Sequence, residues 1–384
     1  MRALNILALN SGSSSLKFGM YRVDSAGAHR LFGDTLATVA TADGPDAMAR
    51  VASLLAACAM PLPDAVGHRV VHGGPAQRQH CRIDDAVLQQ LQAAAAFAPL
   101  HTPAALALVR FSQQHFVGVP QVACFDTQFH AGLPEVARVL PIARELLSQG
   151  MQRYGFHGLS LESIVRQLGD DLPQRLVIAH LGNGASITAV KAGLSIDTSM
   201  GMTPSGGVIM GTRSGDLDPG VLVYLLREKK FDPARLEALV DQRSGLLGIS
   251  GLSGDMRHLH EAAASNRDAS LAIEMFCYAV RKQVAAMVAV LGGLDMLVFT
   301  GGIGENDALV RAEICAGLSW IGVSLDEARN LAASNPSGLI SDGSSRCQVL
   351  VLAAQEDEQI ARHTRALLAP GPYRQSSTPR LSHG

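Results

Sequence analysis

A strand, loop and strand unit that occurs twice is the feature that most limits how this chain can fold. Near the N-terminus an apolar run ends at Asn10, a Gly- and Ser-rich loop follows to Ser15, and LKFGMY then alternates. In the second half the same order recurs as VIAH, LGNGAS and ITAVKAG. Apolar runs and period-two alternation around such turns predict strands. We therefore expect an internal duplication, with two related domains facing one cleft.

The length and composition agree with a two-domain metabolic protein. The chain has 384 residues, which suits two domains of roughly 150 to 200 residues each. Its net charge of −2 predicts no strongly basic face for nucleic acid or a membrane surface. No apolar run reaches the roughly 18 residues of a spanning helix, and the N-terminus is typical of a strand rather than a signal peptide. The 6 cysteines form no C-x-x-C pair, which favours reduced thiols and a cytoplasmic location.

Three polar loops that follow predicted strands suit phosphate binding. The first, Asn10 to Ser15 followed by Lys17, offers backbone N–H groups, hydroxyls and one ammonium. The second runs from His180 to Ser186, and the third from Gly301 to Asn306. The first does not match the P-loop, whose pattern opens a helix, and the third lacks the spacing of a dinucleotide-binding turn. The sequence therefore predicts a nucleotide site of another kind.

Ten elements of the sequence resemble, in order and spacing, the acetate kinase family. They are NSGSSSLK, GHRVVHGG, APLHTP, FDTQFH, RYGFHG, HLGNGAS, MGTRSGDLDPG, SGDMR, FTGGIGEN and the late Glu356. The resemblance implies the α/β fold of the acetate and sugar kinase, Hsp70 and actin superfamily: two duplicated actin-like (ribonuclease H-like) βββαβαβα domains around a nucleotide cleft. The first domain would comprise residues 1–128 and the C-terminal helix 358–384, with a mobile tail at 370–384, and the second residues 129–357 with the adenosine site.

The resemblance also implies the reaction, a reversible Mg²⁺-dependent transfer of the ATP γ-phosphoryl group to acetate that gives acetyl phosphate and ADP. A carboxylate is already ionised at neutral pH and needs no general base, so cations should dominate the site. By resemblance, Arg69 and Arg213 hold the acceptor and the phosphoryl group. His157 donates to the phosphoryl group and, with Arg213, stabilises the transition state. Asp126 would orient an arginine or the metal.

Further binding roles follow from the same resemblance. Asn10 and Glu356 would bind Mg²⁺, with Mn²⁺ as an alternative ion and Glu356 preferred over Glu358. The acyl pocket would be formed by Arg69, Val71, Leu100, Phe156 and Pro204. The nucleotide would contact Lys17, His180, Leu181, Gly182, Asn183, Gly184, Asp255, Met256, Arg257, Gly301, Gly302, Ile303, Gly304, Glu305 and Asn306. His101 would either support the substrate pocket or cap the helix that begins at Pro103. A homodimer is expected.

Three other functions remain open at this level. A propionate kinase of the same family would differ by whether the Val71 wall admits one more methylene. A sugar kinase of the superfamily would use Asp126 as a base on a hydroxyl group. An ATP-binding chaperone-like or regulatory protein would lack an acceptor pocket, and the pair Arg69 and Arg213 argues against it.

Overall fold

The structure, a computed structural model, describes residues 2–12, 15–37, 44–98, 101–332 and 338–368. The chain divides into two units. Unit 1 contains residues 1–132, 158–163 and 355–384, and unit 2 contains residues 133–157 and 164–354. The domain boundaries expected from the sequence stay a prediction.

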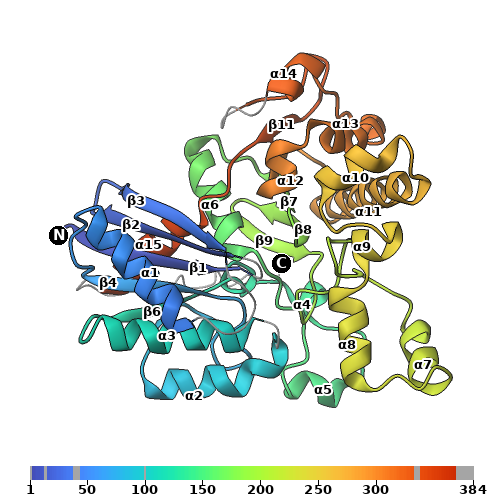
Figure 1. Cartoon of the computed structure of the whole chain (residues 1–384). Helices are drawn as coiled ribbons and strands as arrows, with labels where there is room; N and C mark the ends of the chain where they lie inside the picture. The colour runs from blue at the N-terminus through green and yellow to red at the C-terminus, as the bar shows by residue number, and fades with distance from the viewer. Residues whose placement is uncertain (1, 13–14, 38–43, 99–100, 333–337, 369–384) are drawn as a thin grey trace, which may run out of the picture. The chain divides into compact units, whose positions relative to one another are not determined.

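Unit 1 contains one sheet and the helices packed on it (Figure 1). Its strands are β1 (Leu4–Ser11), β2 (Ser15–Val23), β3 (Ala28–Ala37), β4 (Ala65–Val70), β5 (Cys81–Arg82) and β6 (Gln121–Phe125). Its helices are α1 (Gly44–Ala57), α2 (Asp85–Ala93), α3 (Thr102–His115), the first part of α6 (Gly158–Leu168) and α15 (Glu356–Leu368).

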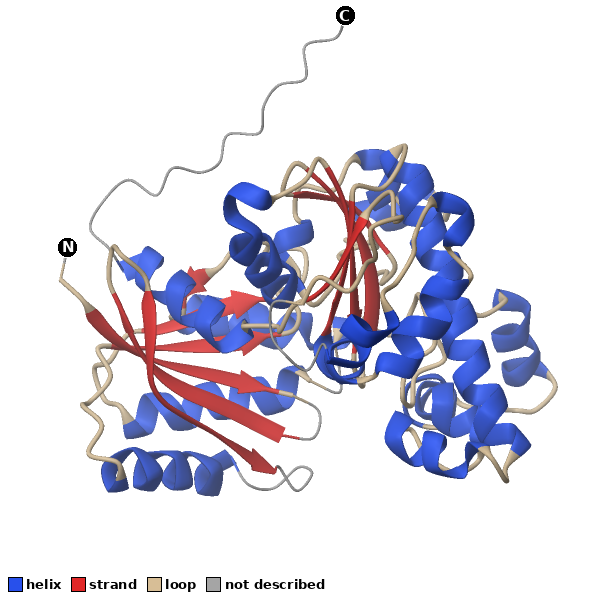
Figure 2. Cartoon of the chain, turned by 90° about the horizontal axis from the view of Figure 1, so that it is seen from above, coloured by secondary structure: helices blue, strands red, loops and turns tan. Residues whose placement is uncertain are grey.

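The central strand β1 is buried on both faces. Leu7 and Leu9 join a core cluster that includes side chains of α1 and α3. Ile6 and Ala8 point to the opposite face and join a second cluster with α15. Figure 2 shows helices on both faces of this sheet. A strand buried on both faces is apolar throughout, which explains the continuous apolar run at the N-terminus.

Unit 2 has a second sheet and most of the helices. Its strands are β7 (Arg175–Leu181), β8 (Ala185–Lys191), β9 (Leu194–Thr198), β10 (Met296–Thr300) and β11 (Gln348–Val351). Its helices are α4 (Glu135–Arg138), α5 (Arg144–Ser148), the rest of α6, α7 (Pro219–Arg227), α8 (Pro233–Gln242), α9 (Gly245–Ser250), α10 (Met256–Ala263), α11 (Arg267–Leu291), α12 (Gly301–Asn306), α13 (Ala308–Ala316) and α14 (Glu327–Ala332). Among the described helices, none combines the length and hydrophobicity that crossing a bilayer requires.

The two sheets share one topology. The strand order is β3-β2-β1-β4-β6-β5 in unit 1 and β9-β8-β7-β10-β11 in unit 2. In each sheet the first three strands are antiparallel, and the next two run parallel to the third. Both sheets also have an irregularity in register between the corresponding outer strands, at β2/β3 and at β8/β9. The predicted α/β fold with an internal duplication is confirmed.

One predicted element is wrong. GGIGEN was expected as a loop, but it forms the short helix α12, which the separate helix α13 follows. Asp307 separates the two helices because its backbone is extended and its side chain accepts a hydrogen bond from the Val310 N–H. Glycines predict a turn, yet Glu305 stabilises the helical turn by accepting the Gly301 N–H at 2.9 Å.

Candidate active site

In unit 1, Arg69 and Asp126 form a buried ion pair. Arg69 lies on β4, and Asp126 directly follows the neighbouring parallel strand β6. The guanidinium donates from Nε and Nη2 to Asp126 Oδ2 at 2.9 and 2.6 Å, and from Nη1 to the Ser11 carbonyl at 2.8 Å. The exposed fractions of the two side chains are 13% and 1%. The pair therefore fixes the direction of one predicted catalytic cation.

The charges around this pair keep the arginine protonated. Burial raises the pKa of Asp126 to about 6, against the lowering effect of Arg69, so the carboxylate is still ionised at neutral pH. Burial by itself lowers the pKa of Arg69, but Asp126 and Glu356 outweigh it and raise that pKa above its usual value. Asp126 thus holds Arg69 through two hydrogen bonds, and the two roles expected for it stay predictions.

Asn10 brings two carboxylates together at the end of β1. Its Nδ2 donates to Glu356 Oε2 at 2.8 Å and to Asp357 Oδ1 at 2.9 Å, both in the first turn of α15. Burial raises the pKa of Asp357, against the effect of the Asn10 hydrogen bond, and the charge of Glu356 raises it further. Two repelling carboxylates and the amide of Asn10 supply oxygen atoms of the kind that a hard divalent cation prefers. These residues therefore fit a divalent cation.

Asp357 was missed in the sequence. It is adjacent to Glu356 in an acidic first turn, which was the available signal. Glu358, the alternative ligand considered from the sequence, instead pairs with Arg362 at 2.8 Å.

Lys17, expected at the phosphates, is exposed on β2 and lies opposite Asn10 in the antiparallel ladder.

In unit 2, the second and third predicted phosphate loops lie side by side. Thr300 pairs with His180 in the parallel ladder of β10 and β7, so the segments after both strands start at one edge of the sheet. Gly301 has φ +78°, and a Cβ there would lie 2.7 Å from the Leu181 carbonyl oxygen. Only glycine meets both conditions without strain. The Gly182 N–H donates to the Gly184 carbonyl at 2.9 Å and tightens the neighbouring loop.

A third segment joins these loops to the expected adenosine residues. The Gly211 N–H donates to the Asn183 carbonyl at 3.1 Å, and a Cβ on Gly211 would lie 3.0 Å from the Gly254 carbonyl oxygen. Asp255 then caps α10 and accepts from the backbone and side chain of Arg257. This contact lowers the pKa of Asp255 to about 2. Met256 is buried.

The α12 residues expected to bind nucleotide are held in place by a set of hydrogen bonds. Glu305 accepts from Gly301 N–H, and also from the Ala354 N–H at 3.0 Å. Asn306 Nδ2 donates to the Gly302 carbonyl at 2.9 Å. Ile303 and Gly304 complete the helix.

His157 and Arg213 meet at the same loop of unit 2. A Cβ on Gly184 would lie 3.1 Å from His157 Nε2 and 3.4 Å from Arg213 Nη1. Arg213 Nη1 also donates to the Pro204 carbonyl at 3.1 Å. The ring of His157 stacks on that of His180, with centroids 4.1 Å apart. Two predicted transition-state groups thus lie beside the predicted phosphate loop.

The residues expected to form the acyl pocket are divided between the two units. Val71 is buried in unit 1, and Phe156 and Pro204 are buried in unit 2. Leu100 and the tail 370–384 lie outside the described residues. His101 occupies the N-cap position of α3, but its side chain makes no capping hydrogen bond, so the capping alternative is wrong.

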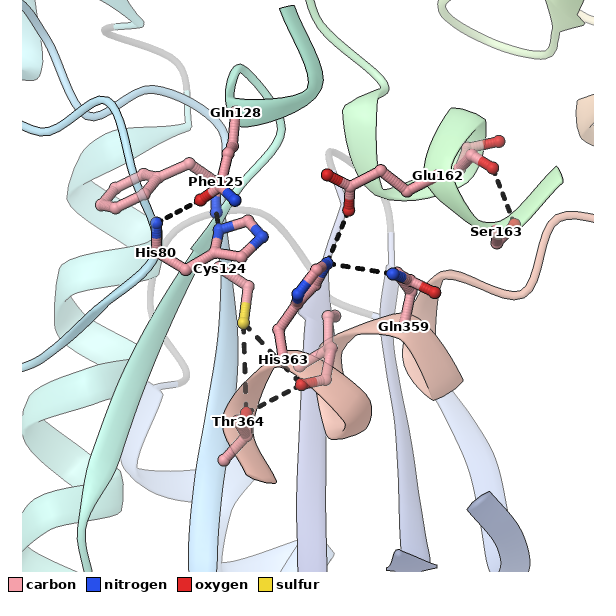
Figure 3. A network of polar contacts seen from close by, with 11 residues as sticks. His80, Cys124, Phe125, Gln128, Glu162, Ser163, Gln359, His363 and Thr364 are labelled. Carbon is pink, nitrogen blue, oxygen red and sulfur yellow. Dashed lines mark hydrogen bonds and ion pairs between the residues drawn. The ribbon is translucent and has the colours of Figure 1, made fainter. Parts of the chain in front are cut away.

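Another group of side chains in unit 1 has the spacing of metal ligands (Figure 3). His80, Glu162 and His363 each offer a ligand atom, and these atoms lie within 4.8 Å of one another. However, His80 Nδ1 accepts the Phe125 N–H at 2.9 Å, and burial lowers the pKa of His80 well below its usual value. The neutral ring therefore carries its proton on Nε2, the nitrogen that would have to bind the metal. This cluster is unsuited to a metal.

The comparisons with known proteins agree with this arrangement. The model of the acetokinase family matches residues 5–362. The acetate kinase of Methylocella silvestris is 41% identical over 94% of this chain and 98% of its own length. The crystal structure of Porphyromonas gingivalis acetate kinase is 33% identical, with a TM-score of 0.81 over 95% of this chain and 100% of that one. A propionate kinase from Francisella tularensis is 36% identical, with a TM-score of 0.84 over the same shares. This chain belongs to the acetokinase family.

Proposed function

We propose that the chain is an acetate kinase, which transfers the γ-phosphoryl group of ATP to acetate reversibly and directly. The observation that carries the proposal is the match to an acetate kinase over 94% of this chain and 98% of the relative. Because the alignment covers 98% of that relative, nearly all of its residues have a counterpart in this chain. The activity itself needs an ionised carboxylate as nucleophile, so no general base is required.

The catalytic roles follow from the charges described above. Arg69, held by Asp126, would bind the acceptor carboxylate, and Arg213 would neutralise the equatorial oxygens of the phosphoryl group. His157 would donate from Nε2 to the same group, because this nitrogen faces the loop at Gly184. Cations positioned before the reaction lower the barrier without reorganisation.

The acyl methyl and the nucleotide would use the remaining predicted positions. Val71, Leu100, Phe156 and Pro204 would form the apolar pocket, in which Val71 limits the length of the acyl chain. The loop from His180 to Gly184 and Lys17 would contact the phosphates. The segments 255–257 and 301–306 would bind the adenosine. This is supported by the contacts of Gly211 with Asn183 and Gly254, and of Gly301 with Leu181, in unit 2.

Asn10, Glu356 and Asp357 would hold Mg²⁺, or Mn²⁺ in its place. The bound ion would neutralise charge on the phosphate oxygens. The convergence of both carboxylates on the Asn10 amide supports this assignment.

Assembly and location belong to the same proposal. We expect two domains, residues 1–128 with 358–384 and residues 129–357, and a homodimer that binds neither nucleic acid nor membrane. A cytoplasmic location is supported by the cysteines, which are all free thiols. Sedimentation equilibrium of the purified protein tests the dimer.

A hydroxamate assay of acyl phosphate tests the activity. The enzyme, ATP and Mg²⁺ are incubated with acetate, propionate or butyrate, and kcat/KM is compared. Acetate is expected to give the highest value. If no acyl phosphate forms while a hexose is phosphorylated, the enzyme is a sugar kinase. If nucleotide binds without transfer to any acceptor, a non-enzymatic role is supported.

A propionate kinase is the second candidate, favoured by the similarity to the Francisella tularensis structure. One additional methylene changes binding by about 1 to 3 kcal/mol in an apolar pocket, so the preference should be tenfold or more. Equal kcat/KM for acetate and propionate would contradict the acetate assignment.

A further inference from the structure

The hydroxyl group of Ser186 contacts the histidine assigned to the phosphoryl group. His157 Nδ1 lies 2.9 Å from Ser186 Oγ, and both residues are buried in unit 2. Ser186 lies on β8, opposite His180 in the antiparallel ladder. The contact therefore connects the N-cap of α6 to the strand that follows the phosphate loop.

The two nitrogens of His157 face different surroundings. Nδ1 faces Ser186, whereas Nε2 lies near the Gly184 backbone, where a Cβ would be 3.1 Å away. Arg213 Nη1 is near the same point. The stacked ring of His180, inclined by 24°, restricts the plane of the imidazole. Nε2 is thus directed to the glycine-rich part of the loop expected to hold phosphate, whereas Nδ1 contacts the last residue of that loop.

A neutral imidazole has one donor and one acceptor nitrogen, and the hydrogen bond at one nitrogen decides the state of the other. If the Ser186 hydroxyl donates to Nδ1, the proton of His157 lies on Nε2 and can be donated to a phosphoryl oxygen. The opposite arrangement would direct a lone pair from Nε2 toward an anionic oxygen. The first arrangement also lets His157 donate without a second positive charge beside Arg213.

The backbone of His157 gives the contact a second role. Its φ of +61° and ψ of +21° are left-handed, which residues other than glycine rarely adopt. Such conformations persist where the surrounding contacts hold them, and they occur often at active sites. The Ser186 hydroxyl is one of these contacts.

We propose that Ser186 is a positioning residue for phosphoryl transfer. Its hydroxyl donates to His157 Nδ1, orients the ring and keeps the proton on Nε2. This inference rests on the function proposed for His157, and it assigns a role to the last residue of the predicted phosphate loop, two positions beyond the residues expected to contact the nucleotide.

Kinetics of three variants test the role. Ser186→Ala should lower kcat about tenfold, with little change in KM for ATP or acetate, because one neutral hydrogen bond is lost from a group that acts in the transition state. Ser186→Thr keeps the hydroxyl and should restore most of the rate. Thr188→Val is the matched control: Thr188 is also buried on β8, but its hydroxyl lies 2.8 Å from that of Thr198. The control should keep the wild-type kcat.

A spectroscopic test needs no variant at position 186. In protein containing ¹⁵N-labelled histidine, the ring signals absent from a His157→Asn variant identify His157. They should show a protonated Nε2 and an unprotonated Nδ1. A proton on Nδ1, or an unchanged kcat in Ser186→Ala, would overturn the inference. If wild-type enzyme formed no acyl phosphate, the proposed function would fail, while the tautomer would still be measured.

Discussion

Neutralising Asp126 is the sharpest test of how unit 1 positions its cation. Asp126→Asn keeps the size of the side chain but removes the charge that accepts two hydrogen bonds from Arg69, at 2.9 and 2.6 Å. Removing one member of a buried ion pair costs about 3 to 5 kcal/mol. The amide oxygen of asparagine can still accept one hydrogen bond, and the charge of Glu356 also favours protonated Arg69. Burial already makes the ionised carboxylate costly, which offsets part of this loss, so we expect the free energy of unfolding to fall by about 1 to 2 kcal/mol.

The activity should fall in parallel, because the guanidinium loses its fixed direction. A loss of about 2.7 kcal/mol in transition-state stabilisation corresponds to a hundredfold lower kcat/KM for acetate. Urea denaturation measures stability, and the hydroxamate assay measures kcat/KM on the same preparations. The KM for ATP should change little, since the positions expected to bind the adenosine, and most of those expected at the phosphates, are in unit 2.

Asp295→Asn is the matched control. Asp295 also accepts from an arginine, with Arg175 Nε at 3.0 Å, but its side chain is 30% exposed. Exposed pairs contribute about 0 to 1 kcal/mol, so this variant should lose little stability and no activity. If Asp126→Asn matched this control in both measurements, Asp126 would not position Arg69 for the reaction.

Four further changes have defined outcomes. Arg213→Ala should lower kcat far more than it weakens ATP binding, because its charge is needed most in the transition state; an unchanged kcat in the folded variant would remove Arg213 from the site. Gly301→Ala should raise the KM for ATP and cost about 1 to 3 kcal/mol of stability, since φ is +78° and its Cβ would meet the Leu181 carbonyl; normal stability by urea denaturation would contradict this. Asp357→Asn should raise the Mg²⁺ concentration for half-maximal rate on the order of tenfold, and an unchanged Mg²⁺ titration would exclude it as a ligand. Burial lowers the pKa of His68 from 6.5 to about 4, so on acidification the unfolded chain takes up this proton before the folded chain does. The free energy of unfolding should therefore fall by about 3 kcal/mol as the pH is lowered from 6.5 to 4. His68→Gln should lose less stability over this range, and an equal loss in the variant and the wild type would show that His68 is not the titrating group.

The sequence predicted the strands well because their apolar pattern is local. The two strand, loop and strand units predicted from the sequence form β1 with β2 and β7 with β8. Buried apolar runs are visible in a sequence without any tertiary contact. The short helix α12 was missed because its stability depends on Glu305 accepting the Gly301 N–H, a side-chain contact that glycine content does not reveal.

The site residues also divide into those that the sequence predicted and those whose contacts only the fold reveals. Arg69 and Asp126 were predicted, but only the parallel register of β4 and β6 shows that they bind each other. The Ser186 contact with His157 joins residues 29 positions apart and has no motif that predicts it. Asp357 was also missed, although it directly follows the predicted metal ligand Glu356 in the sequence.

The duplicated topology explains why residues so distant in sequence act together within each unit. In a sheet with parallel inner strands, the carboxyl ends meet at one edge, and segments that follow them become neighbours. In unit 1 this edge has Asn10 at the end of β1 and Asp126 after β6; in unit 2 it has His180 at the end of β7 and Gly301 after β10. The chemistry of the two edges has diverged, because unit 1 presents carboxylates with a cation while unit 2 presents glycine-rich backbone. A register change of one residue would turn these side chains to the opposite face, so the ladders of the two sheets themselves determine which residues can reach the substrates.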